Sequence, residues 1–131
     1  MIEANQATTV LVADDSPEIR TRLVEALLEL GNLEVIGPCT DGDEALQLFQ
    51  AHSPDAVILD LQMPGIGGLD LITKIRERNT ATIIIILTAH DSPVYRDRCL
   101  TAGANFFFSK NEELAEIVAA LRSRGSDDSS A

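Results

Sequence analysis

Residues 56–65 read Ala-Val-Ile-Leu-Asp-Leu-Gln-Met-Pro-Gly, and this stretch decides the fold. Four apolar residues lead directly into the carboxylate of Asp60, and a turn containing proline and glycine follows. A short continuous apolar run bounded by turn residues is typical of a strand buried on both faces, as in parallel sheets. Asp60 is therefore expected at the carboxyl end of a core strand, the edge where open α/β sheets bind ligands. A carboxylate there can cap a helix, hold a metal ion or act as a nucleophile.

The alternation of buried strand and amphipathic helix continues on both sides of this stretch. Apolar runs predict strands, and apolar residues at helical spacing predict a helix after each strand. Serine followed by proline predicts helix starts at Ser16 and Ser92, and Asp41 with Glu44 resembles a capping box. The strands are expected over residues 8–13, 33–37, 56–59, 82–88 and 105–109. Five strand–helix units predict a single α/β domain whose parallel sheet is covered by helices on both faces.

The helix expected over residues 93–102 has the weakest apolar stripe of the five. Its few apolar residues are interrupted by Arg96, Asp97 and Arg98. The last helix, which follows Asn111, has by contrast a clean apolar stripe. We therefore expect the helix over 93–102 to be the least buried.

The composition and charge of the chain indicate which partners and which cellular location to expect. The chain has 131 residues, of which 45% are apolar, and its formal net charge is -11. Such a charge repels nucleic acid phosphates and anionic membrane surfaces, so neither is expected as a partner. There is no secretory pattern at the N-terminus and no apolar run near the length of a membrane span, so we expect a cytoplasmic protein. Cys39 and Cys99 are expected to be buried free thiols.

The ends of the chain differ from its middle in composition. We expect residues 1–7 to be a flexible leader and residues 8–123 to form the single domain. Residues 124–131 are polar and lack the apolar content that folding needs, so we expect a disordered tail.

Four of the five strands end in a polar group, and parallel strands bring these ends to one edge of the sheet. Taken singly, each group has an ordinary explanation such as a helix cap or a solvated charge, because short motifs give false positives. Five such groups at one edge are harder to explain in that way. They are Asp14, Asp15, Asp60, Thr88 and Lys110.

Electrostatics indicates what this group of residues can hold. Two carboxylates about 4 Å apart repel each other by roughly 4 kcal/mol at an effective dielectric constant near 20. Lys110 offsets part of that charge, and a hard divalent cation such as Mg²⁺ can offset the rest. Mg²⁺ shares its ligands readily with phosphoryl groups, and carboxylates form aspartyl-phosphates. The sequence therefore predicts a site for Mg²⁺ and a phosphoryl group, with Asp60 as the covalent acceptor.

These residues, together with the Met-Pro-Gly of 63–65, Thr88-Ala89 and Gly103-Ala104, resemble the receiver domain of bacterial two-component response regulators. The resemblance covers roughly residues 8–122. It implies a flavodoxin-like, doubly wound (βα)5 fold with a five-stranded parallel sheet in the order 2-1-3-4-5.

The resemblance also implies a phosphotransfer reaction. Asp60 would accept a phosphoryl group from the phosphohistidine of a sensor histidine kinase or a histidine phosphotransfer protein. Lys110 and Thr88 would contact the transferred group. The protein would thus catalyse its own phosphorylation and dephosphorylation without being a conventional enzyme.

Further roles follow from the same resemblance. Asp14, Asp15 and Asp60 would hold Mg²⁺ with the backbone carbonyl of Gln62. The side chains of Gln62 and His90 would flank the approach of the hydrolytic water and modulate the lifetime of the phosphoryl group.

Two residues would form the switch. Thr88 would move toward the phosphoryl group, and Phe107, three residues before Lys110, would change its rotamer. The alternative is that Phe107 is simply a core residue. A downstream protein would bind the face formed by residues 92–122.

Two features depart from a typical receiver. Asn111 stands where the family usually has proline after the lysine; a cis bond without proline costs about 2.5–4 kcal/mol, so we expect a trans Lys110–Asn111 bond. In addition, no output domain follows residue 122 in this sequence, which predicts a stand-alone, chemotaxis-type receiver that acts by protein contact.

Three alternatives remain open at this point. An aspartate-nucleophile phosphatase would usually carry a second aspartate where this chain has Gln62. A flavin-binding module of the same fold would need a loop that cradles phosphate, whereas residues 14–17 are acidic. The chain could also be a receiver fragment of a longer response regulator.

Overall fold

The computed structural model describes residues 8–31, 33–89 and 92–110, together with residues 117, 119 and 121. Several expectations fall outside this part of the chain. They concern the leader over 1–7, the role of His90, the Lys110–Asn111 bond, most of the last helix and the tail over 124–131.

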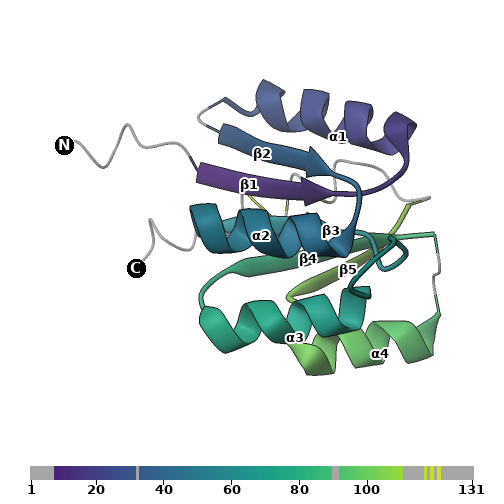
Figure 1. Ribbon diagram of the computed structural model, residues 1–131. Helices are drawn as coiled ribbons and strands as arrows, with labels where there is room; N and C mark the ends of the chain where they lie inside the picture. Colours follow the sequence, from purple (N-terminus) through teal and green to yellow (C-terminus); the bar gives the residue numbers. More distant parts are fainter. Residues whose placement is uncertain are drawn as a thin grey trace.

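The described residues form a five-stranded parallel sheet with helices on both faces (Figure 1). The strands lie in the order β2-β1-β3-β4-β5, which confirms the predicted flavodoxin-like topology. The strands are β1 (Thr8–Ala13), β2 (Leu33–Cys39), β3 (Ala56–Leu59), β4 (Ile83–Thr88) and β5 (Phe106–Ser109). The helices are α1 (Pro17–Glu29), α2 (Gly42–His52), α3 (Gly68–Arg78) and α4 (Pro93–Ala102).

Alternate residues of each strand enter two separate cores, because successive side chains of a strand point to opposite faces. In β1, Leu11 packs in the core formed with α2, α3 and α4, whereas Val12 packs in the core formed with α1 and with Ile117 and Leu121. All four residues of β3 are buried, which confirms that this strand is covered on both faces. Asp60 therefore directly follows the central strand of the sheet.

Strand β2 is longer than the sequence predicted. It was expected to end at Gly37, but it continues to Cys39 through a bulge in which two residues of β2 lie opposite Val12. Gly37 has a φ of 95°, and a Cβ there would lie 3.0 Å from the Val12 carbonyl oxygen, so the bulge requires glycine. Pro38 is tolerated because β2 is an edge strand. Strands β4 and β5 each begin one residue later than predicted.

The predicted helix starts are confirmed by side-chain caps. The Ser16 hydroxyl accepts a hydrogen bond from the Ile19 amide, and the Asp41 carboxylate accepts one from the Glu44 amide. The Ser92 hydroxyl accepts bonds from the first turn of α4. Each cap satisfies amide groups that the first turn of a helix leaves without a partner.

Among the four helices that the structure describes, α4 has the fewest buried residues, which agrees with the prediction as far as these helices test it. Within α4, all of which is described, only Cys99 is fully buried, and Val94 is 59% exposed. Cys39 and Cys99 are buried free thiols, as expected. Every helix in the described part of the chain is too short or too polar to span a membrane.

Candidate functional site

The backbone holds the residues of the predicted site at the carboxyl edge of the sheet. The Asp14 amide donates to the Cys39 carbonyl at 3.0 Å, and the Asp60 amide donates to the Ala13 carbonyl at 3.0 Å. The Lys110 amide donates to the Thr88 carbonyl at 2.8 Å. Each residue thus extends the hydrogen-bond ladder beyond the end of its strand, which fixes where its side chain emerges.

Lys110 joins two of the predicted carboxylates. Its Nζ donates to Asp14 Oδ1 at 3.0 Å and to Asp60 Oδ2 at 2.9 Å. Both carboxylates are almost completely buried. Burial alone would lower the pKa of Lys110, but the hydrogen bonds to Asp60 and Asp14, together with the attraction of their negative charges, outweigh burial and raise it. The ammonium group therefore stays charged and holds the two carboxylates together.

Asp14 has one carboxylate oxygen that is satisfied and one that is not. Oδ1 accepts from Lys110 and from the Ser16 amide at 2.8 Å. Oδ2 is buried and has no hydrogen-bond partner among the described residues. Burial raises the pKa of this carboxyl group. An orphaned buried oxygen in a native fold needs an explanation, and a cation is one.

Three carboxylates meet closely enough to bind one metal ion. Asp14, Asp15 and Asp60 each offer an oxygen, and these oxygens lie within 4.8 Å of one another. Asp15 is exposed, so the cluster is open to solvent on one side. Mg²⁺ prefers a few carboxylate oxygens and keeps several waters, so this donor set fits Mg²⁺.

Asp60 is held at both oxygens. Oδ2 accepts from Lys110, and Oδ1 accepts from the Gln62 amide at 3.1 Å. Leu59 pairs with Ile86 in the register of β3 and β4, so the fully buried Thr88 lies next to the end of β3. The Gln62 side chain is exposed. The structure thus brings Asp14, Asp15, Asp60 and Lys110 together and places Thr88 at the same edge.

Phe107 lies within β5, three residues before Lys110, and not at the edge of the sheet where the predicted site residues lie. Its side chain is 4% exposed and belongs to the core under α2, α3 and α4. Phe106 and Phe108 point to the opposite face and stack on each other with ring centroids 6.0 Å apart. The interpretation of Phe107 as a core residue describes this conformation, and its role as a switch stays a prediction.

The sequence interpretation missed Arg20. Its guanidinium donates to the Asp14 carbonyl oxygen at 3.0 Å and so helps to fix the backbone at Asp14. A weak signal was present, because a cation near the N-terminus of a helix opposes the helix dipole.

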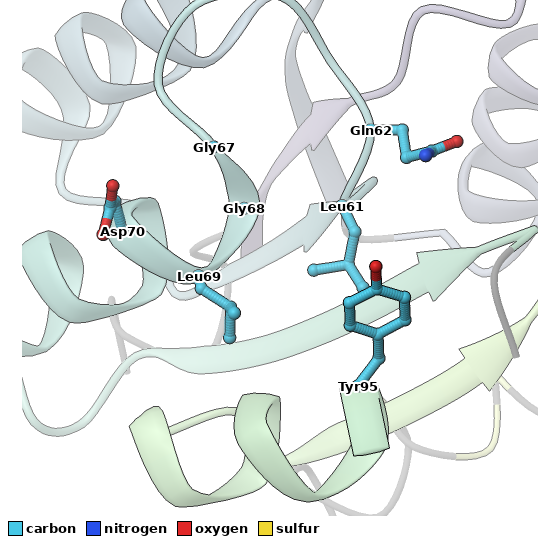
Figure 2. Close-up of a pocket in the computed structure, with 7 residues that line it drawn as sticks. All are labelled: Leu61, Gln62, Gly67, Gly68, Leu69, Asp70 and Tyr95. Atoms are coloured by element: carbon cyan, nitrogen blue, oxygen red, sulfur yellow. The ribbon is translucent and has the colours of Figure 1, made fainter. Parts of the chain in front are cut away.

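A cavity of about 330 Å³ lies beside the site, between the β3–α3 loop and α4 (Figure 2). Leu61 and Gln62, which directly follow Asp60, form part of its wall. In Figure 2 the Leu61 side chain points toward the Tyr95 ring, whereas the Gln62 side chain points away from it. The other lining residues are Gly67, Gly68, Leu69 and Asp70.

Comparison with known proteins gives a consistent result. Residues 10–122 match the family described as response regulator receiver domain. The chain is 38% identical over 112 residues to the probable transcriptional regulatory protein NarL of Mycobacterium tuberculosis, covering 86% of this chain and 52% of that protein. It is 34% identical to the DNA-binding transcriptional activator EvgA of Escherichia coli K12, covering 85% of this chain and 54% of that protein.

Solved structures agree with these relatives. The signal receiver domain of the putative response regulator NarL from Mycobacterium tuberculosis superimposes with a TM-score of 0.84 at 35% identity, covering 92% of this chain and 98% of that one. A response regulator from Burkholderia pseudomallei with a phosphorylated aspartic acid and a calcium ion superimposes with a TM-score of 0.79 at 26% identity, covering 94% and 71%.

The chain spans about half the length of the curated relatives it matches. One of these relatives is described as DNA-binding, so they give no support to the expectation that nucleic acid is excluded as a partner. The prediction of a stand-alone receiver likewise stays a prediction.

Proposed function

Because the chain belongs to the response regulator receiver domain family, we propose that Asp60 is the phosphoryl acceptor of this two-component receiver. The observation that supports the assignment most directly is the position of Lys110, whose ammonium group contacts Asp60 and Asp14 at once. The solved relative with a phosphorylated aspartic acid adds support from the same family.

The proposed donor of the phosphoryl group is a phosphohistidine, as expected for this family. An oxygen of Asp60 attacks the phosphorus, an O–P bond forms, and the N–P bond breaks with its electron pair staying on the imidazole, which takes up a proton. The Gln62 amide and Lys110 orient the attacking carboxylate. Lys110 and Thr88 then contact the oxygens of the transferred group, where charge develops.

The residues proposed to hold Mg²⁺ are Asp14, Asp15 and Asp60, together with the backbone carbonyl of Gln62. When bound, the ion supplies positive charge to the phosphoryl oxygens. The orphaned oxygen of Asp14 supports this assignment, because a cation would satisfy it. Without the ion, these carboxylates repel one another, and Lys110 is the one cation that an ion pair of the described residues brings to them.

Output is proposed to pass through Thr88 and Phe107 to a protein that binds the face of residues 92–122. Gln62 and His90 are proposed to set the rate of hydrolysis. A histidine kinase or phosphotransfer protein is the expected donor. A cytoplasmic location and the nature of the downstream partner stay predictions.

The first experiment measures phosphorylation directly. The protein is incubated with Mg²⁺ and acetyl phosphate, and intact mass spectrometry should show the addition of one phosphoryl group. Asp60→Asn should abolish the addition, whereas Asp70→Asn, which removes an exposed carboxylate on α3, should leave it unchanged. A phosphoryl group that persists in Asp60→Asn would refute the assignment.

A second experiment isolates the metal. A ligand that binds only the native state stabilises it by about 2.7 kcal/mol at a hundredfold excess over its dissociation constant. Mg²⁺ should therefore raise the melting temperature, and Asp15→Asn should reduce that rise. Equal melting temperatures in EDTA and in excess Mg²⁺ would contradict the magnesium assignment.

A further inference from the structure

Arg96 of α4 makes two contacts with the same residue of β5. The guanidinium carbon lies 6.0 Å from the centroid of the Phe107 ring. Its NH1 group also faces the Phe107 carbonyl oxygen at 3.4 Å. A cation over an aromatic ring is attracted by the negative face of the ring. One side chain thus contacts both the ring and the main chain of Phe107.

Phe107 is linked to the candidate site through the backbone. It pairs with Ile86 in the register of β4 and β5, and two residues further along Thr88 pairs with Ser109. The next amide, that of Lys110, donates to the Thr88 carbonyl. A shift of the ends of β4 and β5 toward Asp60 therefore displaces the strand segment that carries Phe107.

The other end of α4 is held more firmly. Arg76 of α3 donates from Nε to the Gly103 carbonyl at 2.9 Å and from NH2 to the Asn105 side-chain oxygen at 2.8 Å. The same Asn105 oxygen also accepts a bond from the Ile84 amide at 2.8 Å. This connection joins α3, β4 and the end of α4 at the edge of the sheet opposite Asp60.

Space is available on the α3 side of α4. The cavity of about 330 Å³ includes Tyr95 in its wall, and a second of about 360 Å³ is lined by Arg98, Thr101 and Ala102 of α4. Leu69 of α3 borders both cavities. Both hollows are open to solvent, so the side chains on this side of α4 can change position without meeting a closely packed neighbour.

We propose that Arg96 is a positioning residue that couples α4 to the conformation of Phe107, with the Arg76 contact at Gly103 as the fixed end of the helix. This inference rests on the proposed phosphorylation of Asp60. When Phe107 and its strand shift, Arg96 carries the N-terminal half of α4 with them. The orientation of the exposed face of α4 thereby depends on the state of the site.

The test uses amide hydrogen exchange of α4, with and without Mg²⁺ and beryllofluoride, a mimic of the phosphoryl group. In the wild-type protein, beryllofluoride should change exchange in α4. Arg96→Met removes the charge and keeps much of the aliphatic stem. It should raise α4 exchange in the unliganded protein roughly two- to fivefold, which is what a contact of this kind supports. It should also remove most of the response to beryllofluoride.

Two variants serve as controls. Arg98→Met makes the same chemical change two residues further along α4, on the side that faces the second cavity, and should keep the wild-type response. Arg96→Lys keeps the cation without the planar group and should restore part of the response. Combining Arg96→Met with Phe107→Leu should add little to the loss caused by either change alone.

The outcomes separate the inference from the proposed function. A melting temperature that beryllofluoride raises equally in wild type and Arg96→Met shows that the site still binds the mimic. If the α4 response is then also unchanged in Arg96→Met, the inference is wrong and the proposed function stands. If wild-type protein gains no stability from beryllofluoride and Mg²⁺, both are wrong.

Discussion

Helices α3 and α4 lie side by side on the same face of the sheet but are stabilised in opposite ways (Figure 1). Helix α3 buries Gly68, Leu71, Ile72 and Ile75, yet its N-cap, Gly67, makes no side-chain hydrogen bond. Helix α4 buries only Cys99, yet Ser92 caps it and proline occupies its first position. Tertiary burial stabilises α3, whereas local signals stabilise α4.

The difference indicates where the protein can move. Segments with few buried apolar contacts open at the lowest free energy cost. Because α4 carries its own caps, it can remain helical while its packing changes. A helix that must change position without unfolding benefits from this combination, and α4 begins five residues after Thr88 at the candidate site.

The largest expected effect comes from the core of α3. Ile72→Ala removes a fully buried side chain and should lower the free energy of unfolding by about 2–5 kcal/mol. Val94→Ala on α4 should change it by no more than about 0.5 kcal/mol, because Val94 is 59% exposed. Urea denaturation measures both. Similar losses in the two variants would show that α4 is held as firmly as α3.

The second-largest loss of stability is expected at the contact between Gly103, at the end of α4, and Arg76 of α3. Gly103 ends α4 with a φ of 129°, and a Cβ there would lie 2.5 Å from Cγ of Arg76. Gly103→Ala should cost about 1–3 kcal/mol in backbone strain, with an added loss from displacing Arg76.

Gly31→Ala is a control for the backbone strain that an alanine causes at a glycine with positive φ. Gly31 has a φ of 72°, and a Cβ there would meet no atom of the described part of the chain within 4 Å. Its φ lies near the left-handed region, which costs an alanine roughly 1–2 kcal/mol, so this variant should show a smaller loss from backbone strain alone. Equal losses of stability at Gly31 and Gly103 would mean that neither the Arg76 contact nor the more unusual φ of Gly103 adds a cost.

Removing the N-cap of α4 and adding one to α3 tests how much each helix depends on local capping. Ser92→Ala removes the N-cap of α4 and should cost about 1 kcal/mol, whereas Gly67→Ser supplies α3 with the cap it lacks and should gain a few tenths. A Cβ at Gly67 would meet none of the described residues within 4 Å, so the serine fits. Thermal melting measures both changes. If Gly67→Ser gains more stability than Ser92→Ala loses, the conclusion that α4 depends on its cap more than α3 does would be wrong.

The smallest effect is kinetic and is measured as a rate of thiol labelling. Both thiols are buried, and burial raises the pKa of Cys39 to about 12 and also raises that of Cys99. Neither thiol should react while it is buried. A movement of α4 away from the core would expose Cys99 to the reagent. Labelling with a thiol reagent, followed in Cys39→Ala and Cys99→Ala variants, should be faster at Cys99. Faster labelling at Cys39 would place the least stable region at β2 instead.

The sequence by itself determined the order of strands and helices, the caps and the residues at the functional edge. Continuous apolar runs can be read locally, and so can serine or aspartate before a helix, because these signals depend on near neighbours. The topology rule that parallel strands end at one edge then placed Asp14, Asp60, Thr88 and Lys110 together. The same local signals ended β2 too early, because the bulge at Gly37 depends on pairing with β1.

The contacts between distant residues were decided only by the tertiary structure. Lys110 meets Asp14 across 96 positions of sequence, and no local pattern indicates that one ammonium group bridges two carboxylates or leaves Asp14 Oδ2 without a partner. The arginine contacts made by Arg76 and Arg96 are of the same kind. Long side chains can reach many acceptors from one backbone position, so only the packed arrangement of strands and helices selects which one they bind.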